Sequence, residues 1–504
     1  KTAGSTVTLG MAVNNEGGSW ADSFAGSILL DGGGSHSGAF TVNGGTVQLS
    51  GGSHTFGAGE VAGAGDLRVG AGATAVIDDA LTMNGDFRLD GGVWQGGAAA
   101  VLANGSGAAT LSSGSVEGTV VNEGAMFLNL GGVIGGAGTL VNRGVNALVS
   151  KTAGSTVTLG MAVNNEGGAW ADSFAGSILL AGGGSHSGAF TVNSEVVGLS
   201  GGTHTFGDGS VDGAGELSVT GSGTALIDGT VTMNGDFRLA GGTLQGGAAG
   251  VLANGAGTAT LASGALEGTV VNEGTLLLNL GGTIGGAGTL VNRGVNALVS
   301  KTAGSTVTLG MAVNNEGGSW DESNAGDLLL AGGGTHSGAF TVNGGAVALS
   351  SGTHLFQDGA SVGGVGALQY TGATVEIGGS VTFSNGLTLQ SGVLQGAGDI
   401  QGSVVNSGGT VSPGLSAGVL NISGDYTQGP GGRLLLEVLG TSPGTGHDQL
   451  NVSGTLNLGG ELEFLFGVFD PTGTTLDLIS YGAVQGTFTT ITNQPQDSNL
   501  LGLT

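Results

Sequence analysis

The sequence predicts an all-β protein, a right-handed parallel β-helix (β-solenoid) forming one elongated rod with a carboxyl-terminal cap. The first observation is a 150-residue repeat: KTAGSTVTLGMAVNNEGG begins at Lys1, Lys151 and Lys301, and residues 1–150 and 151–300 differ at 33 aligned positions. The second is a near-repeat of about 18–23 residues within each copy, the length of a solenoid coil. The third is composition: 114 Gly, 5 Pro and short β-branched runs between turn residues.

Short apolar runs in the first copy mark the expected strands, and a turn follows each one. In DFRL, Phe87 and Leu89 point to one side and Arg88 to the other, so one face of each strand is buried. No helical spacing persists beyond about one turn. The expected strands are Thr6–Leu9, Ile28–Leu30, Phe40–Val42, Val47–Leu49, Leu67–Val69, Ala75–Ile77, Leu81–Met83, Phe87–Leu89, Thr119–Val121, Phe127–Leu130, Thr139–Val141 and Ala147–Val149.

Asparagine motifs recur at coil spacing. Val-Asn-Glu-Gly at 121–124 returns as Val-Asn-Arg-Gly at 141–144, and Asn-Asn-Glu-Gly at 164–167 opens the next copy. Coils stacked at ~4.8 Å would align these residues in a ladder at one corner, with each Asn bonding the backbone and the Asn above it. We expect Asn to tolerate a left-handed corner and the neighbouring Gly to relieve it. About 25 coils would make a rod on the order of 120 Å long.

Four segments organise the chain. Residues 1–150 and 151–300 are the first two solenoid repeats, and 301–399 is a third, partial one. From about Ile400 the repeat is abandoned, and prolines, absent before, appear together with several Phe and Tyr residues. An open solenoid end exposes unpaired strand edges, so we interpret 400–504 as terminal coils plus a cap.

Composition and charge restrict the partners. The net charge of −27 disfavours nucleic acid and anionic lipid surfaces. Every apolar run is shorter than the ~18 residues of a membrane span. The absence of cysteine suits a bacterial surface protein and equally a cytosolic one. No secretory signal is visible, and we expect the chain to be a piece of a longer polypeptide.

The carboxyl-terminal run SPGLSAGVLNISGDYTQGPGGRLLLEVLG, then DQLNVSGTLNLGGELEF and LDLISYGAVQGTFTTI, resembles the end of autotransporter passengers and related bacterial surface β-helix proteins. In that family this portion caps the helix and helps to start its folding. The resemblance covers about residues 395–490; the upstream coils are similar in style to autotransporter-associated repeats and filamentous adhesins. No outer-membrane barrel follows in this sequence and no protease triad is visible, so self-secretion and proteolysis are not implied.

Histidine is the first candidate for chemistry. His36 and His54 lie one coil apart, and the pair returns as His186/His204 and His336/His354. Two imidazoles without a placed carboxylate or Cys make a poor metal site, so we interpret the pairs as a polar turn ladder. His447 stands alone and supports no proposal. The sequence therefore predicts no catalytic, cofactor-binding or metal site and no cofactor.

Carboxylates are the second candidates. Asp78, Asp79 and Asp86, or Asp208 and Asp212, offer oxygen donors for calcium, but neither β-roll nor EF-hand spacing is present, and solvated surface acids are the preferred interpretation. Asp79 becomes Gly229 in the second copy, and Asp208 corresponds to Ala58 in the first. Thr6/Thr8 and Thr258/Thr260 hint at an ice-binding face without continuing it.

A carbohydrate-active β-helix enzyme, a polysaccharide lyase or hydrolase, is the alternative class. Such an enzyme needs a fixed pair of carboxylates, and none is singled out. Many charged positions change between copies, among them Asp31 to Ala181, Glu60 to Ser210 and Arg68 to Ser218. The basic positions that repeat are Arg88/Arg238, Arg143/Arg293 and Lys1/Lys151/Lys301.

We therefore expect a non-enzymatic extracellular β-solenoid of a bacterial surface, an adhesin shaft or filament subunit in attachment, aggregation or biofilm matrix. Expected partners are further copies, end to end or side by side, and a host, surface or matrix polysaccharide or protein receptor. We expect no nucleic acid, and membrane contact only through an anchor or barrel outside this sequence.

Overall fold

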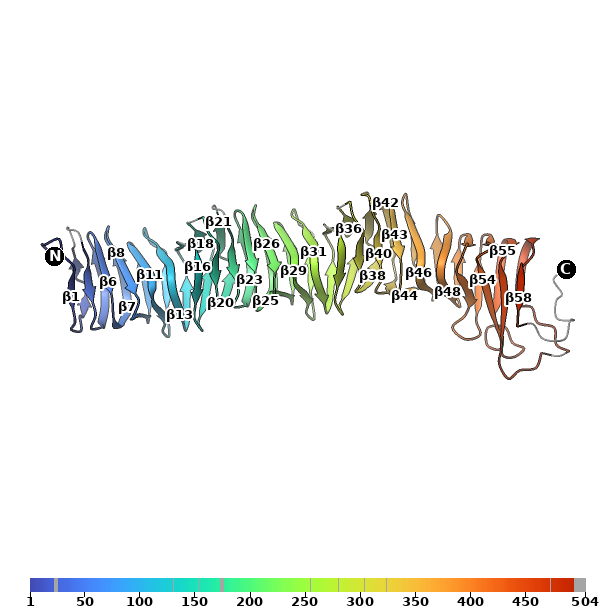
Figure 1. Cartoon of the computed structure of the whole chain (residues 1–504), viewed down its shortest axis with the longest axis horizontal. Helices are drawn as coiled ribbons and strands as arrows, with labels where there is room; N and C mark the ends of the chain where they lie inside the picture. The colour runs from blue at the N-terminus through green and yellow to red at the C-terminus, as the bar shows by residue number, and fades with distance from the viewer. Residues whose placement is uncertain are drawn as a thin grey trace. The chain divides into compact units, whose positions relative to one another are not determined.

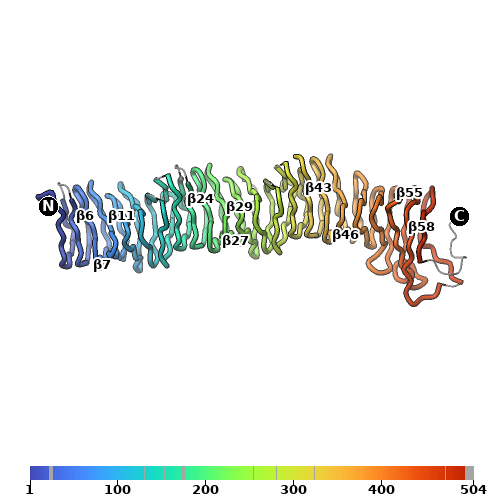
Figure 2. Tube along the Cα trace, in the orientation of Figure 1, coloured from blue at the N-terminus to red at the C-terminus, as the bar shows by residue number. Residues whose placement is uncertain are grey.

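The computed structural model describes residues 1–21, 26–129, 131–152, 154–172, 176–253, 255–279, 281–302, 304–322, 324–471 and 473–493. These residues form 58 strands and no helix, and the strands stack in parallel register as a β-solenoid, which confirms the predicted fold class. The chain divides into two compact units, unit 1 (Lys1–Thr260) and unit 2 (Leu261–Thr504). In each unit, successive coils of the chain lie side by side (Figures 1 and 2).

The strands of unit 1 are β1 (Val7–Leu9), β2 (Asn15–Glu16), β3 (Ser19–Trp20), β4 (Ile28–Leu30), β5 (Gly34–Val42), β6 (Thr46–Leu49), β7 (Gly52–Ala62), β8 (Asp66–Gly70), β9 (Ala73–Ile77), β10 (Ala80–Met83), β11 (Asp86–Gly96), β12 (Val101–Ala103), β13 (Ala109–Glu117), β14 (Thr119–Asn122), β15 (Ala125–Leu128), β16 (Gly132–Gly135), β17 (Thr139–Arg143), β18 (Leu148–Lys151), β19 (Val157–Leu159), β20 (Ala162–Glu166), β21 (Ala169–Asp172), β22 (Ile178–Leu180), β23 (Gly184–Val192), β24 (Val196–Leu199), β25 (Thr203–Asp212), β26 (Glu216–Thr220), β27 (Thr224–Ile227), β28 (Thr230–Met233), β29 (Asp236–Gly246) and β30 (Val251–Ala253).

The remaining strands are β31 (Ala259–Glu267), which contains the unit boundary, and β32 (Thr269–Asn272), β33 (Thr275–Leu278), β34 (Gly282–Gly285), β35 (Thr289–Arg293), β36 (Leu298–Lys301), β37 (Val307–Leu309), β38 (Ala312–Glu316), β39 (Ser319–Glu322), β40 (Leu328–Leu330), β41 (Gly334–His336), β42 (Ala339–Gly344), β43 (Ala346–Leu349), β44 (Thr353–Phe356), β45 (Ser361–Gly364), β46 (Ala367–Ile377), β47 (Ser380–Phe383), β48 (Leu387–Gly396), β49 (Asp399–Gln401), β50 (Val404–Asn406), β51 (Thr410–Pro413), β52 (Val419–Ile422), β53 (Tyr426–Gln428), β54 (Arg433–Val438), β55 (Gln449–Leu458), β56 (Glu461–Phe466), β57 (Ile479–Gly486) and β58 (Thr490–Thr492).

Each coil of unit 1 has three sides, so the stacked strands make three faces. Face A begins with β1, β4, β6 and β8 and continues to β15, β18 and β21. Face B begins with β2, runs through β9 and reaches β16, β19 and β22. Face C begins with β3, runs through β10, β12 and β14, and reaches β17, β20 and β23. Long strands such as β5 and β11 bend and contribute to two faces.

The 150-residue repeat is not a whole number of coils. Strand β1, which opens the first copy, lies on face A, whereas its equivalent β19 in the second copy lies on face B. Likewise β2 lies on face B and its equivalent β20 on face C. One copy therefore comprises seven coils plus one further side. Equivalent residues of the first two copies face different directions around the axis of unit 1.

The core is a set of stacked apolar ladders. On face A, Leu30, Leu49 and Val69 lie one above another in register, and each is fully buried. Phe87 and Leu89 are buried while Arg88 is half-exposed, which confirms the predicted alternation. Every expected strand overlaps an observed one in its described residues; Leu130, at the end of one prediction, lies outside them. Six strands of the first copy were not expected: β2, β3, β7, β12, β13 and β16.

Glycine, and not asparagine, takes the left-handed conformation beside the asparagine ladder, so that part of the prediction was wrong. Asn122, Asn142 and Asn165 lie in extended strands, whereas Gly144 and Gly167 have φ of 90° and 84°. Among the described non-glycine residues, only Glu195 and Asn493 have positive φ. A strand conformation lets each asparagine point inward, while the following glycine makes the turn.

The parallel stacking continues past Ile400 in unit 2. Val419 pairs with Gln449 and Arg433 with Glu461, so the coils there are longer than the early ones, in which Val7 pairs with Ile28. The last described strand, β58, pairs with β56. The terminal coils are thus present, and the expected cap remains a prediction.

Candidate functional site

The repeated histidine pairs lie inside the solenoid. His186 and His204 belong to β23 and β25 and are 4% and 0% exposed, with Nε2 of His186 3.0 Å from Nδ1 of His204. The two rings stack at an interplanar angle of 10°, and His186 also packs edge-on against Phe190. His36/His54 and His336/His354 repeat this geometry at 3.0 and 3.1 Å. The predicted turn ladder was therefore wrong in its location: the pairs are in strands and face the core.

A ladder of asparagines leads to the second histidine pair on face C. Nδ2 of Asn122 donates to Oδ1 of Asn142 at 2.9 Å, and Nδ2 of Asn142 donates to Oδ1 of Asn165 at 3.2 Å. This confirms the predicted stacking of Asn on Asn. Nε1 of Trp170 also donates to Oδ1 of Asn165, at 2.9 Å. Unit 2 repeats the ladder with Asn272, Asn292 and Asn315.

Hydrogen bonding defines the tautomers of the second pair. The backbone N–H of Asn165 donates to Nδ1 of His186 at 3.3 Å, so His186 carries its proton on Nε2 and donates it to Nδ1 of His204. His204 then carries its proton on Nε2, 3.2 Å from the carbonyl oxygen of Gly201. With both rings neutral, every imidazole nitrogen of the pair has a hydrogen-bond partner. All four ring nitrogens of the pair are therefore engaged in hydrogen bonds, and none is left free to bind a metal ion.

Burial strongly disfavours the charged forms of these rings. Burial, reinforced by the neighbouring imidazole, lowers the pKa of His36 to about 4 and those of His186 and His336 to about 3. Burial also lowers the pKa of His204 and of His354 to about 4. Within the described residues, no group of three or more His, Cys, Asp or Glu side chains is placed to hold a metal ion.

Three of the candidate calcium ligands accept hydrogen bonds from nearby N–H groups, within a turn or from the next coil. Oδ1 of Asp79 accepts from the N–H of Ala80 at 2.7 Å, and Oδ1 of Asp208 accepts from the N–H of Thr230 at 2.8 Å. Asp212 accepts from the amide of Asn234 at 2.7 Å. Asp78 and Asp86 are exposed. The structure does not bring these five acids together at one site.

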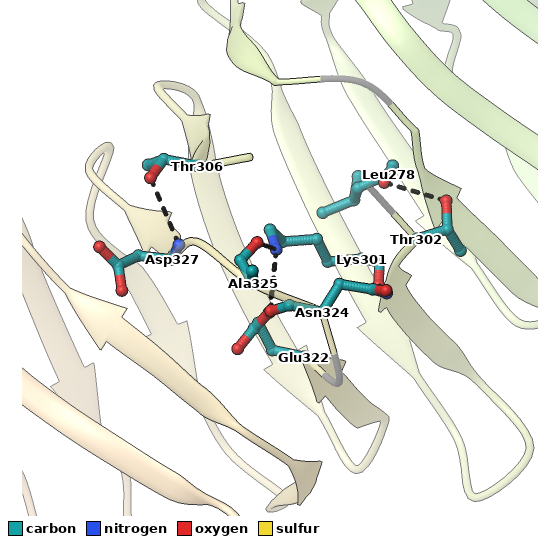
Figure 3. Close-up of polar contacts among 8 residues, drawn as sticks. All are labelled: Leu278, Lys301, Thr302, Thr306, Glu322, Asn324, Ala325 and Asp327. Carbon is teal, nitrogen blue, oxygen red and sulfur yellow. Dashed lines mark hydrogen bonds and ion pairs between the residues drawn. The ribbon is translucent and has the colours of Figure 1, made fainter. Parts of the chain in front are cut away.

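In the second and third copies the repeated lysine is an interior residue, which sequence reasoning missed, whereas Lys1 is half-buried. Lys301 is 1% exposed, and its Nζ lies 2.9 Å from Oε1 of buried Glu322 and 2.8 Å from the carbonyl oxygen of Ala325 (Figure 3). The amide of Asn324 donates back to the carbonyl oxygen of Lys301 at 2.8 Å. Lys151 is buried to the same degree. The sequence did contain a sign of this burial, because the lysine recurs at the end of a short apolar strand pattern.

The repeated arginines are surface residues. Nη2 of Arg143 lies 2.6 Å from Oε1 of Glu123, and Arg293 and Glu273 repeat this pair. Arg238 lies 3.9 Å from Glu216. All of these side chains are about 30–44% exposed. Such ion pairs belong to the solvated faces and do not converge on a groove.

Two carboxylates near the carboxyl end form a constellation that the sequence did not reveal. Asp448 is fully buried and accepts from the N–H groups of Gly418 and Glu437, both at 2.8 Å. The side chain of Glu437 accepts from the N–H of Ala417 at 3.0 Å. Burial, followed by the nearby Glu437, raises the pKa of Asp448 to about 6. Because both acids bind backbone N–H groups, they hold the 414–418 turn against β54.

A surface hollow of about 450 Å³ lies along β45, β46 and β48. Its lining includes Val362, Gln369, Asn385 and Gln390, and none of the lining residues is charged. A glycoside-cleaving site needs two carboxylates on either side of the bond. This hollow does not supply them.

Comparison of the chain with protein-family models, with curated proteins and with solved structures gave no match. The described residues contain no helix that could cross a membrane.

Proposed function

We propose that this chain is an extracellular structural and adhesive β-solenoid of a bacterial surface, acting as an adhesin shaft or filament subunit. The observation that carries the proposal is the asparagine ladder. Asn122 and Asn142 close the first copy and Asn165 opens the second, so the hydrogen bonds of the interior run across the junction. A copy that joins the next one in this way can be added or removed without a new interface. Duplication then adds length.

Equivalent residues of the first and second copies lie on adjacent faces of unit 1, and this supports a role in joining separate bodies. In unit 1 the same side chains recur on a different face, as with exposed Ser35 on face B and Ser185 on face C. A receptor that recognises the repeat can thus be engaged from more than one side. This suits aggregation or a matrix, where separate bodies must be joined.

Removal of one whole copy tests the proposal. Deleting residues 151–300 joins Ser150 to Lys301 and recreates the natural junction. Cells carrying this variant should display a folded shaft shorter by about seven coils, roughly 35 Å at the strand spacing, and should attach or aggregate less. The control deletion of 151–250 joins β18 to β30, both of which belong to face A. It should fail to fold, because the next strand must lie on face B.

Unchanged attachment and aggregation by the shortened, folded shaft would contradict the proposal. The enzyme alternative has a separate test: incubation of the purified chain with plant and bacterial polysaccharides. Turnover that one carboxylate substitution abolishes would favour a carbohydrate-active enzyme.

A further inference from the structure

We propose that the three buried histidine pairs are acid-sensitive latches, which open the coils at the start of each copy when one imidazole of a pair takes up a proton. The rest of the solenoid keeps its hydrogen bonds. The device is independent of which receptor the shaft binds. Its basis is the hydrogen-bond arrangement of each pair.

The second pair has no acceptor for an additional proton. A proton on Nδ1 of His186 would face the N–H of Asn165, 3.3 Å away, and a proton on Nδ1 of His204 would face the N–H of His186 at 3.0 Å. Proton uptake at either nitrogen would place two N–H donors opposite each other with no acceptor between them. An unsatisfied, charged group inside a protein is strongly destabilising unless it is paired.

Charged neighbours offer no compensation inside the coil. The strands that pack on this pair carry five charged residues, all on the exposed or half-exposed outer surface: Glu166 in β20, Asp208 and Asp212 in β25, and Asp236 and Arg238 in β29. Strands β23, β27 and β28 carry no charged residue. The side chain of Asp172, in β21, lies outside the described residues. The ring environment is instead aromatic, with Phe190 and Phe206 at centroid distances of 5.1 and 4.7 Å from His186.

The other two pairs carry buried nitrogens without a hydrogen-bond partner. These are Nδ1 of His36 in the first copy, and Nδ1 of His336 and Nε2 of His354 in the third. A proton taken up by Nδ1 of His36 or of His336 would have no hydrogen-bond partner among the described residues. The same weak point therefore recurs at the same place in all three copies.

Opening exposes both rings to water and lets them titrate normally. The lowered pKa of His36, about 4 against 6.5 for a free side chain, predicts a roughly twentyfold rise in the ratio of open to closed coil at pH 5 relative to pH 7. Such an opening uncovers strand edges only in the segments around 34–56, 184–206 and 334–356. Strands without histidine, such as β14 and β17, should remain closed.

Hydrogen–deuterium exchange on the full chain, corrected for intrinsic rates, tests the proposal between pH 7.4 and pH 4.5. We expect faster exchange in the three histidine segments and unchanged protection in β14 and β17. The decisive variant is His186→Asn with His204→Asn, because the chain already stacks Asn on Asn in its ladder. Segment 184–206 should then lose its acid response, while the unaltered segments 34–56 and 334–356 retain theirs within the same molecule.

His447→Asn is the matched control, since His447 is buried but belongs to no pair; all three segments should still respond. An acid response that persists in segment 184–206 of the double variant would overturn the proposal. So would simultaneous loss of protection in every coil, or no change above pH 4.5. If the double variant does not fold, His204→Gln alone provides the same comparison with a smaller change.

Discussion

The side-chain amide of Asn142 donates to the side-chain oxygen of Asn165 at 3.2 Å, and the two residues belong to different copies of the repeat. Both are completely buried. Buried polar networks of this kind are known to specify register in other folds. Here the same contact recurs in unit 2 between Asn292 and Asn315, at 3.4 Å.

Asn142→Ala should destabilise the junction by about 1–3 kcal/mol, because it leaves the carbonyl oxygen of Ala169 and one amide proton of Asn122 without their partner. Hydrogen exchange in β14, β17 and β20 measures the effect. Asn146→Ala, at an exposed turn position nearby, is the control and should change stability by less than about 0.5 kcal/mol. Equal effects of the two substitutions would refute the structural role of the ladder.

Lys301→Met should cost about 3–5 kcal/mol, since it leaves the Glu322 carboxylate buried without its partner. Replacing both residues, as in Lys301→Met with Glu322→Leu, should recover most of the loss. Chemical denaturation of the two single variants and the double variant measures this coupling. The exposed pair supplies the comparison: Arg293→Met should cost at most about 1 kcal/mol. A double variant as unstable as the sum of the singles would contradict the pairing.

The overall stability should fall in mild acid. Five of the six paired histidines, His36, His186, His204, His336 and His354, have folded-state pKa values near 3–4, below the value of 6.5 for a free side chain. Burial also lowers the pKa of His54. The unfolded chain therefore binds more protons below pH 6.5. Their contribution is complete above pH 6.5 and is lost as the pH falls toward 4. The shift for His36 alone corresponds to about 3 kcal/mol.

Asp448 changes the pH dependence of stability in the opposite direction from the histidines. Its folded pKa of about 6 exceeds the ordinary 3.8, so its contribution decreases as the pH rises from 3.8 to 6. Because six histidines lose their contribution in acid and only one carboxyl gains, we expect a net loss of stability as the pH falls. Melting temperatures recorded between pH 7.5 and 4 test this balance, and a melting temperature that rises on acidification would show that the carboxyl term dominates.

The advance by one face can be measured by spin-label distances, because the chain has no cysteine. Ser35→Cys with Leu179→Cys labels two positions on face B that are seven coils apart and offset by four residues along the strands. A rise of roughly 34 Å and an offset of roughly 13 Å together predict roughly 36 Å. Ser35→Cys with Ser185→Cys labels equivalent residues of two copies at the same axial separation but on faces B and C. The second distance should be several ångströms longer. Identical distances would mean that the copies share a face.

Much of the fold followed from local pattern. The alternation around Phe87 and Leu89, the turn after each short apolar run and the stacking of Asn122 on Asn142 are all visible because strands and coils repeat at short, regular intervals. The buried location of the histidines was harder to predict from the sequence. His36 sits beside glycines and serines, a composition typical of turns, yet the register of β5 on β2 directs it inward.

The sequence alone determined the coil, its parallel strands, its inward and outward sides and the repetition of a 150-residue unit, because each of these is written in spacing along the chain. Only the tertiary structure decided that Lys301 meets Glu322, that Asp448 holds a distant turn, and that a copy ends one side beyond seven coils. Those facts depend on where long strands such as β5 and β11 bend. The bends include Gly38 in β5 and Gly91 in β11, which have φ of 73° and 94°. Glycine is so frequent in this chain that the sequence does not show which glycines bend a strand and which lie in turns between strands.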